Sequence, residues 1–147
     1  MRLDRKTSFA RTVTVARAVL DANVFVRSAV HRSTDARAWL DAVEADELDG
    51  HVPELVYAEL GNALLTYVRA EKMTVDDAAA ALKTVVALPL RAHRVGDLAP
   101  SALALALQTG LSVYDCCYAV LAESLDAPLV TADRRLAAAV PAAELLS

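Results

Sequence analysis

Cysteine is nearly absent from this sequence, and the two that it has exclude several kinds of protein. Cys116 and Cys117 are adjacent in a segment of helical pattern, so a disulfide between them would be strained. They have neither the spacing of metal ligands nor that of a disulfide framework. We therefore interpret both as small, buried core residues.

Long apolar runs and linker-like stretches are absent as well. No apolar run reaches the roughly 18 residues that a membrane-spanning helix needs. The basic start of the chain lacks a secretory core, because Arg17 and Asp21 interrupt its short apolar stretch. Without repeats, low-complexity tracts or Gly/Ser linkers, the sequence predicts one cytoplasmic domain over residues 18–147. Residues 1–17 are interpreted as an N-terminal extension of uncertain order.

A strong excess of one charge is also missing. The 147 residues carry 15 Lys and Arg against 19 Asp and Glu, a net charge of −4, which gives no global signature of nucleic-acid binding. A nucleic-acid site is not excluded, because a bound cation reverses the sign of an acidic pocket. The hydrophobic share of 56% and the charged share of 23% argue against disorder and suit a single core.

The sequence does contain a regular alternation of strand-like and helix-like segments. Strands are expected at residues 16–26, 50–53, 90–95 and 127–131, with a short last strand at 142–146. Helices are expected between them, at residues 35–48, 53–72, 75–88, 100–110, 112–126 and 132–140. Their ends are marked by Ser33 or Thr34 as a cap, Pro53 at a first helical position, Thr74 with Asp77, and Gly110.

This alternation predicts an α/β fold in which right-handed crossovers build a mostly parallel sheet, covered by helices on both faces. Binding sites in such sheets form outside the carboxyl ends of the strands. Asp21 follows the strand-like "AVL", and Asp133 follows "LVTA". These two acids are therefore the first indication of a functional site.

Four acids share an unusual setting, because each is flanked by apolar residues beside a segment expected to be buried. They are Asp21, Glu59, Asp115 and Asp133. Taken alone, each is explained as a helix cap or a surface residue, and Asp115 stands where a helix begins. Taken together, carboxylates in one pocket repel one another unless a cation neutralises them. Oxygen ligands suit Mg²⁺ or Mn²⁺, whereas zinc would call for histidine or suitably spaced cysteine.

Three stretches that contain these acids resemble the PIN domain, and within it the VapC-type toxins of bacterial toxin–antitoxin pairs. "VLDANVFV" is similar to the first-strand motif, with Asp21 and its polar companion Asn23. "VPELVYAELGNAL" resembles the helix that carries the second acid, Glu59. "TGLSVYDCCYAVLAESLDAPLVTAD" resembles the most specific stretch of the family and contributes Asp115, Thr131 and Asp133. The likeness runs from about Val19 to the end of the chain.

The resemblance implies a three-layer α/β/α sandwich around a parallel sheet of four or five strands. It also implies a metal-dependent ribonuclease that cuts single-stranded or looped RNA. Mg²⁺, for which Mn²⁺ can substitute, would be held mainly by Asp21 and Asp115. Glu59 would ligate the ion, hold a metal-bound water or act as general base, and Asp133 would act through water or support a second ion. Asn23 and Thr131 would orient carboxylates or water, with turn chemistry as the alternative.

The resemblance further implies a homodimer and a small antitoxin that blocks the groove. For RNA contact we expect the guanidinium groups of Arg134, Arg135 and Arg27, with solvated surface as the alternative for each. Tyr114 and Tyr118 are possible stacking surfaces for a base, with core packing as the alternative.

Two other functional classes compete with a ribonuclease: a PIN-like binding module without catalysis, and a phosphoaspartate enzyme. The intact set of four acids argues against the first. The absence of a D-x-D loop and of any lysine after Lys83 argues against the second.

Overall fold

The computed structural model describes residues 15–147, so most of the expected extension at residues 1–17 lies outside the described residues. Ala16 and Arg17 belong to the first strand. The strands are β1 (Ala16–Leu20), β2 (Leu48–Pro53), β3 (Arg91–His93), β4 (Leu129–Thr131) and β5 (Ala143–Leu145). The helices are α2 (Ala22–Ala29), α3 (Thr34–Glu44), α4 (Leu55–Arg69), α5 (Val75–Ala87), α6 (Val95–Thr109), α7 (Val113–Leu125) and α8 (Arg134–Ala138).

All five strands are parallel and lie in the order β3-β2-β1-β4-β5. The chain builds outward from β1 through β2 to β3, and then returns to the other side of β1 with β4. The strand order therefore reverses between β1 and β4, where Leu20 pairs with Val130. In an open parallel sheet this switch point, at the carboxyl ends of the strands, is where a binding crevice forms.

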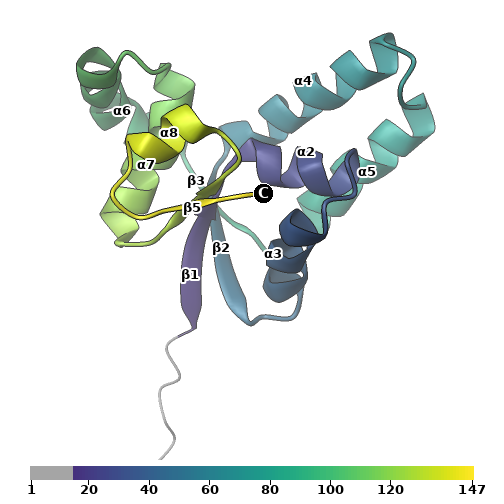
Figure 1. Ribbon diagram of the computed structural model, residues 1–147, viewed down its shortest axis with the longest axis horizontal. Helices are drawn as coiled ribbons and strands as arrows, with labels where there is room; N and C mark the ends of the chain where they lie inside the picture. Colours follow the sequence, from purple (N-terminus) through teal and green to yellow (C-terminus); the bar gives the residue numbers. More distant parts are fainter. Residues whose placement is uncertain (1–14) are drawn as a thin grey trace, which may run out of the picture.

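Helices cover both faces of the sheet, as predicted. Figure 1 shows α6 and α7 on one side and α2, α3, α4 and α5 on the other, with α4 and α5 forming a hairpin that extends away from the sheet. The core lies between these layers, and its largest fully buried side chains include Tyr118, Phe25, Leu20, Leu60 and Leu121. The three-layer α/β/α sandwich with a parallel sheet is confirmed.

The first strand is shorter than predicted. It ends at Leu20, and the apolar residues that follow belong to α2. The backbone N–H of Ala22 donates to the Asp21 side chain, and the N–H of Val24 donates to the Asp21 carbonyl, so Asp21 begins a helix instead of continuing the strand. Val24 and Phe25 are fully buried as neighbours on the helix, and a short buried apolar run has the same pattern in a helix as in a buried strand.

The predicted helix at residues 53–72 also begins later than expected. Pro53 is the last residue of β2 and pairs with His93, and the backbone N–H of Glu54 donates to the His93 carbonyl. This pairing keeps the chain extended at Pro53, so α4 begins only at Leu55. Conversely, α6 begins before its predicted start and continues through Pro100, with Leu98 and Ala102 buried on either side.

The helix caps follow the sequence closely. The Ser33 hydroxyl accepts the N–H of Ala36, and the Thr74 hydroxyl accepts the N–H of Asp77. Gly110 ends α6 with a φ of 73°, a left-handed conformation that glycine adopts without steric cost. Both cysteines are buried and unpaired, as predicted. No single helix within residues 15–147 is both long enough and apolar enough to cross a membrane.

Candidate metal and nucleic-acid site

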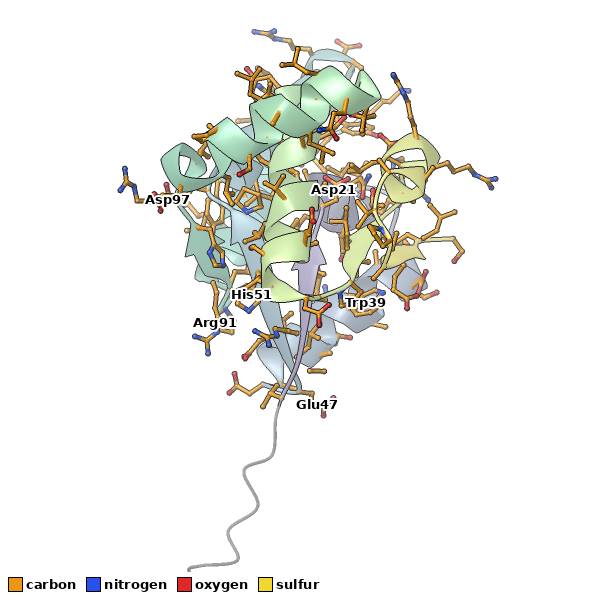
Figure 2. All side chains as sticks on the ribbon, turned by 90° about the vertical axis from the view of Figure 1, so that its left-hand side faces the viewer. Asp21, Trp39, Glu47, His51, Arg91 and Asp97 are labelled. Carbon is orange, nitrogen blue, oxygen red and sulfur yellow. The ribbon has the colours of Figure 1, made fainter. Side chains whose placement is uncertain are left out.

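Asp21 lies at the carboxyl end of β1, at the switch point of the sheet (Figure 2). Its side chain is buried, with 6% of the residue exposed, and it accepts three hydrogen bonds. Oδ1 accepts the N–H of Ala22 at 2.7 Å, while Oδ2 accepts the Thr131 hydroxyl at 2.7 Å and the Asn23 amide at 3.1 Å. A buried carboxylate with this many donors is held in one orientation.

Thr131 and Asn23 join the ends of β1 and β4. Besides its bond to Asp21, the Thr131 hydroxyl accepts the backbone N–H of Asp133 at 3.0 Å. The Asn23 side-chain oxygen accepts the N–H of Ala132 at 3.0 Å. Both residues therefore take part in the turn after β4 and also donate to the carboxylate of Asp21.

Glu59 lies on α4 and is half-buried. The hydroxyl of Tyr118, on α7, donates to its Oε1 at 2.7 Å. Tyr118 is fully buried, so its interpretation as a stacking surface for a base is wrong and core packing is correct. Burial and the Glu59 charge raise the pKa of Tyr118, which keeps its hydroxyl a permanent donor.

Asp115 lies in the first turn of α7 but is not the N-cap of this helix. The cap is Ser112, whose hydroxyl accepts the backbone N–H of Asp115 at 3.0 Å. Asp133 differs, because it is the N-cap of α8 and its Oδ1 accepts the N–H groups of Arg135 and Leu136 at 2.9 and 3.2 Å. The helix-cap interpretation therefore accounts for one oxygen of Asp133 and is excluded for Asp115.

The pKa values of Asp21, Glu59 and Asp115 are affected by neighbouring acids, although these residues come from separate parts of the chain. Burial raises the pKa of Asp21 to about 6, against the hydrogen bonds from Thr131 and Ala22, and the charges of Asp115 and Asp133 raise it further. Burial also raises the pKa of Glu59, with contributions from Asp21 and Asp115. Asp21 is therefore close enough to Asp115 and Asp133 to be affected by their charges, and Glu59 is close enough to Asp21 and Asp115.

The pKa of Asp115 is raised as well, first by burial and then by the charge of Asp133, whereas Ser112 and the guanidinium of Arg135 lower it. Within residues 15–147, no three acidic, histidine or cysteine side chains stand close enough together to hold a metal ion as they are placed. As they are placed, the acidic side chains do not form a closed coordination shell.

The residues expected to contact RNA lie at different places. Arg134 and Arg135 are exposed on α8, and Arg135 donates to the Gly110 carbonyl at 3.2 Å. Tyr114 is 66% exposed at the start of α7. Arg27 is on α2, and its guanidinium donates to the carbonyl of Ser147 at 3.4 Å. Arg134, Arg135 and Tyr114 therefore flank the segments that carry Asp115 and Asp133, while Arg27 is engaged with the C-terminal residue.

Sequence reasoning missed two polar contacts. The Tyr118–Glu59 hydrogen bond was not anticipated, although Tyr118 lies three residues after Asp115 and therefore on the same side of α7. The ring nitrogens of His51 and His93 lie 2.9 Å apart on β2 and β3. The spacing along the chain gave no signal for this histidine pair, because it depends on how the two strands pair.

Comparison with known proteins agrees with this fold. The family model of the PIN domain matches residues 18–140. Ribonuclease VapC3 from Pyrobaculum aerophilum is 32% identical over 126 residues, which cover 84% of this chain and 95% of that protein. Ribonuclease VapC1 from Mycobacterium tuberculosis is 36% identical over 91 residues, which cover 60% of this chain and 66% of that protein.

Solved structures of similar proteins have the same fold. The crystal structure of PAE2754 from Pyrobaculum aerophilum has a TM-score of 0.68 at 31% identity, covering 88% of this chain and 90% of that one. VapBC2 from Rickettsia felis, solved with a DNA fragment from its promoter, has the same fold, with a TM-score of 0.66 at 16% identity over 89% of this chain and 99% of that one. The chain therefore belongs to the PIN domain family, and within it to the VapC group.

Proposed function

We propose that this protein is a metal-dependent endoribonuclease, the toxin of a toxin–antitoxin pair, which hydrolyses phosphodiester bonds of single-stranded or looped RNA. The observation that carries the proposal is the gathering of acids around Asp21 at the switch point of the sheet, where the charges of Asp115 and Asp133 raise the pKa of Asp21 and the charges of Asp21 and Asp115 raise that of Glu59. The ribonuclease names of the VapC relatives, which span most of this chain, support the reaction class.

The chemistry of the donor set fits Mg²⁺ or Mn²⁺. The site offers carboxylate oxygens, and burial and mutual repulsion make their ionised forms costly until a cation neutralises them. Asp21 and Asp115 would hold the ion, with Glu59 and Asp133 nearby. Because Mg²⁺ keeps several of its waters, a site of separated carboxylates suits it better than a closed protein cage would.

Different residues of the chain would have different roles in phosphodiester hydrolysis. A bound divalent ion supplies charge neutralisation at the phosphate and lowers the pKa of water. Thr131 and Asn23 hold the Asp21 carboxylate in one orientation. Glu59, with its Oε1 fixed by Tyr118 and its pKa raised by burial, is suited to accept a proton from the attacking water. Arg134 and Tyr114 would contact the RNA strand beside the acids.

The structural relatives support a protein partner for this chain. VapBC2 from Rickettsia felis and a toxin–antitoxin complex from Klebsiella pneumoniae share this fold, which supports a small antitoxin protein as the cognate partner. Self-association into a homodimer is supported by Leu103 and Leu107, which are 53% and 80% exposed one turn apart on α6. We place the protein in the cytoplasm, where its RNA substrates are found.

The deciding experiment is cleavage of a labelled single-stranded RNA by the purified protein, with and without divalent ions. We expect no cleavage after exhaustive chelation and restored cleavage with Mg²⁺ or Mn²⁺. Duplex DNA of the same sequence is the control and is expected to stay intact. Cleavage that survives chelation would contradict the metal site. Absence of any cleavage with all four acids intact would favour the alternative, a PIN-like binding module.

A further inference from the structure

We infer that Tyr118 is a positioning residue for the reaction, because its buried hydroxyl fixes the side chain of Glu59 relative to Asp115. The inference rests on the proposed function, since it assigns Tyr118 a role toward two residues of that site. It arises from the only hydrogen bond that joins a buried tyrosine to one of the four acids within residues 15–147.

The geometry gives the hydroxyl little freedom. Tyr118 is fully buried, so its ring is held by the core and the position of its hydroxyl oxygen is set by packing. The hydroxyl donates to Oε1 of Glu59 at 2.7 Å, a short and charge-assisted hydrogen bond. One oxygen of Glu59 is therefore fixed, and the other is left as the oxygen that can face an ion or a water.

Because Tyr118 lies on α7, this hydrogen bond links Glu59 to the helix that also carries Asp115. Asp115 and Tyr118 are three residues apart on the same helix, so they project from one side of it. Glu59 comes from α4, on the opposite face of the sheet. The hydrogen bond thus ties Glu59 to the helix that carries Asp115, and it sets the separation of two carboxylates that no backbone pairing connects.

The simpler interpretation is that Glu59 merely satisfies a buried tyrosine hydroxyl. The two interpretations differ in what the bond does for a metal ion. If the bond positions Glu59, its loss weakens ion binding even when the fold is intact. If it serves only the fold, its loss changes stability and leaves ion affinity unchanged.

The test is Tyr118→Phe, which keeps the ring and removes the hydroxyl. Mn²⁺ affinity is measured by electron paramagnetic resonance, and kcat and KM on a single-stranded RNA are measured at saturating Mn²⁺. Groups that orient metal-site residues typically change affinity or activity by about tenfold or more when removed, so we expect a fall of about tenfold in Mn²⁺ affinity or in kcat. The KM for RNA should change by less than about twofold, because the hydroxyl contacts no substrate.

Tyr67→Phe is the matched control. The Tyr67 hydroxyl also makes a side-chain hydrogen bond, to Nε2 of His31 at 3.0 Å, and Tyr67 lies on α4 about 12 Å along the helix from Glu59. We expect this variant to bind Mn²⁺ and cleave RNA as the unmodified protein does. Glu59→Gln provides the second background, since Tyr118→Phe should add little to its defect if the hydroxyl acts through Glu59.

The outcomes separate this inference from the function on which it rests. If the unmodified protein binds Mn²⁺ and cleaves RNA while Tyr118→Phe behaves like Tyr67→Phe, the inference is overturned and the proposed function stands. An equal loss on the Glu59→Gln background would also overturn it, because the hydroxyl would then act by another route. If the unmodified protein neither binds Mn²⁺ nor cleaves RNA, the proposed function and this inference fail together.

Discussion

The hydroxyl of Thr131 donates to Oδ2 of Asp21 at 2.7 Å, although the two residues are 110 positions apart in the chain. Both are buried, and both follow the strand pairing of Leu20 with Val130 at the centre of the sheet. The bond therefore connects the first and fourth strands at the point where the strand order reverses. It also favours the ionised form of a carboxylate that burial would otherwise neutralise.

Replacing Thr131 with valine tests this connection. Valine keeps the shape of threonine but leaves Oδ2 of Asp21 without its hydroxyl donor and the N–H of Asp133 without its acceptor. We expect the free energy of unfolding to fall by about 1–3 kcal/mol and RNA cleavage to fall by about tenfold. Thr131→Ser keeps the hydroxyl and is the control. Chemical denaturation and cleavage assays check both, and full activity in the valine variant would show that the bond is dispensable.

The burial of Asp21 predicts that Asp21→Asn is more stable than the unmodified protein in the absence of metal. A pKa raised from 3.8 to about 6 makes the charged form costly at neutral pH, by up to about 3 kcal/mol. An amide loses one acceptor for the Thr131 and Ala22 donors, so we expect a net gain of about 1 kcal/mol. Thermal unfolding at pH 7.5 with chelator measures it.

Adding Mn²⁺ should reverse this order. A ligand that binds only the folded state raises its stability, so Mn²⁺ should raise the unfolding temperature of the unmodified protein and leave that of Asp21→Asn nearly unchanged. Cleavage by the variant should be lost. An Asp21→Asn variant that is less stable without metal and still responds to Mn²⁺ would contradict the assignment of Asp21 as a ligand.

Asp115 and Ser112 give a matched pair for separating metal binding from helix capping. Ser112 is the N-cap of α7, so Ser112→Ala should lower the free energy of unfolding by about 1 kcal/mol and leave Mn²⁺ binding in place. Asp115→Asn should abolish cleavage and weaken Mn²⁺ binding sharply, while costing the fold little. Titration of Mn²⁺ with each variant checks this. Normal cleavage by Asp115→Asn would show that this acid does not take part in the reaction.

The histidine pair predicts a dependence of stability on pH. Burial lowers the pKa of His51 from its ordinary 6.5, and the positive charges of His93, Arg91 and Arg17 lower it further, against Asp49. The folded protein therefore binds fewer protons at this site than the unfolded chain, so stability should be full above pH 6.5 and fall as the pH drops through and below that value.

The contact between the two rings adds to the effect of burial. With ring nitrogens 2.9 Å apart, one ring must donate and the other accept, and two fully protonated rings would face each other with two donors. His51→Gln should flatten the loss of stability between pH 7 and pH 5, and the exposed His31→Gln should not. Denaturant unfolding at several pH values measures this. An unchanged slope in His51→Gln would assign the acid sensitivity to other groups.

The sequence by itself determined the alternation of strands and helices, most helix caps and the set of acids that are candidates for a metal site. These are local features: a cap depends on a residue and its neighbours three positions on, as at Ser33 and Thr74, and an acid between apolar residues is visible in the chain itself. Local reasoning also misplaced the end of β1 and the start of α4, because a cap at Asp21 and strand pairing at Pro53 overrode apolar pattern and proline preference.

Only the tertiary structure decided which polar groups meet. The bond from Thr131 to Asp21 depends on β4 pairing with β1, and the bond from Tyr118 to Glu59 joins side chains of α7 and α4, which lie on opposite faces of the sheet. That Ser112, and not Asp115, is the N-cap of α7 likewise required the placement of individual atoms. Contacts between residues so far apart in sequence are fixed by strand order and core packing, which no local pattern encodes.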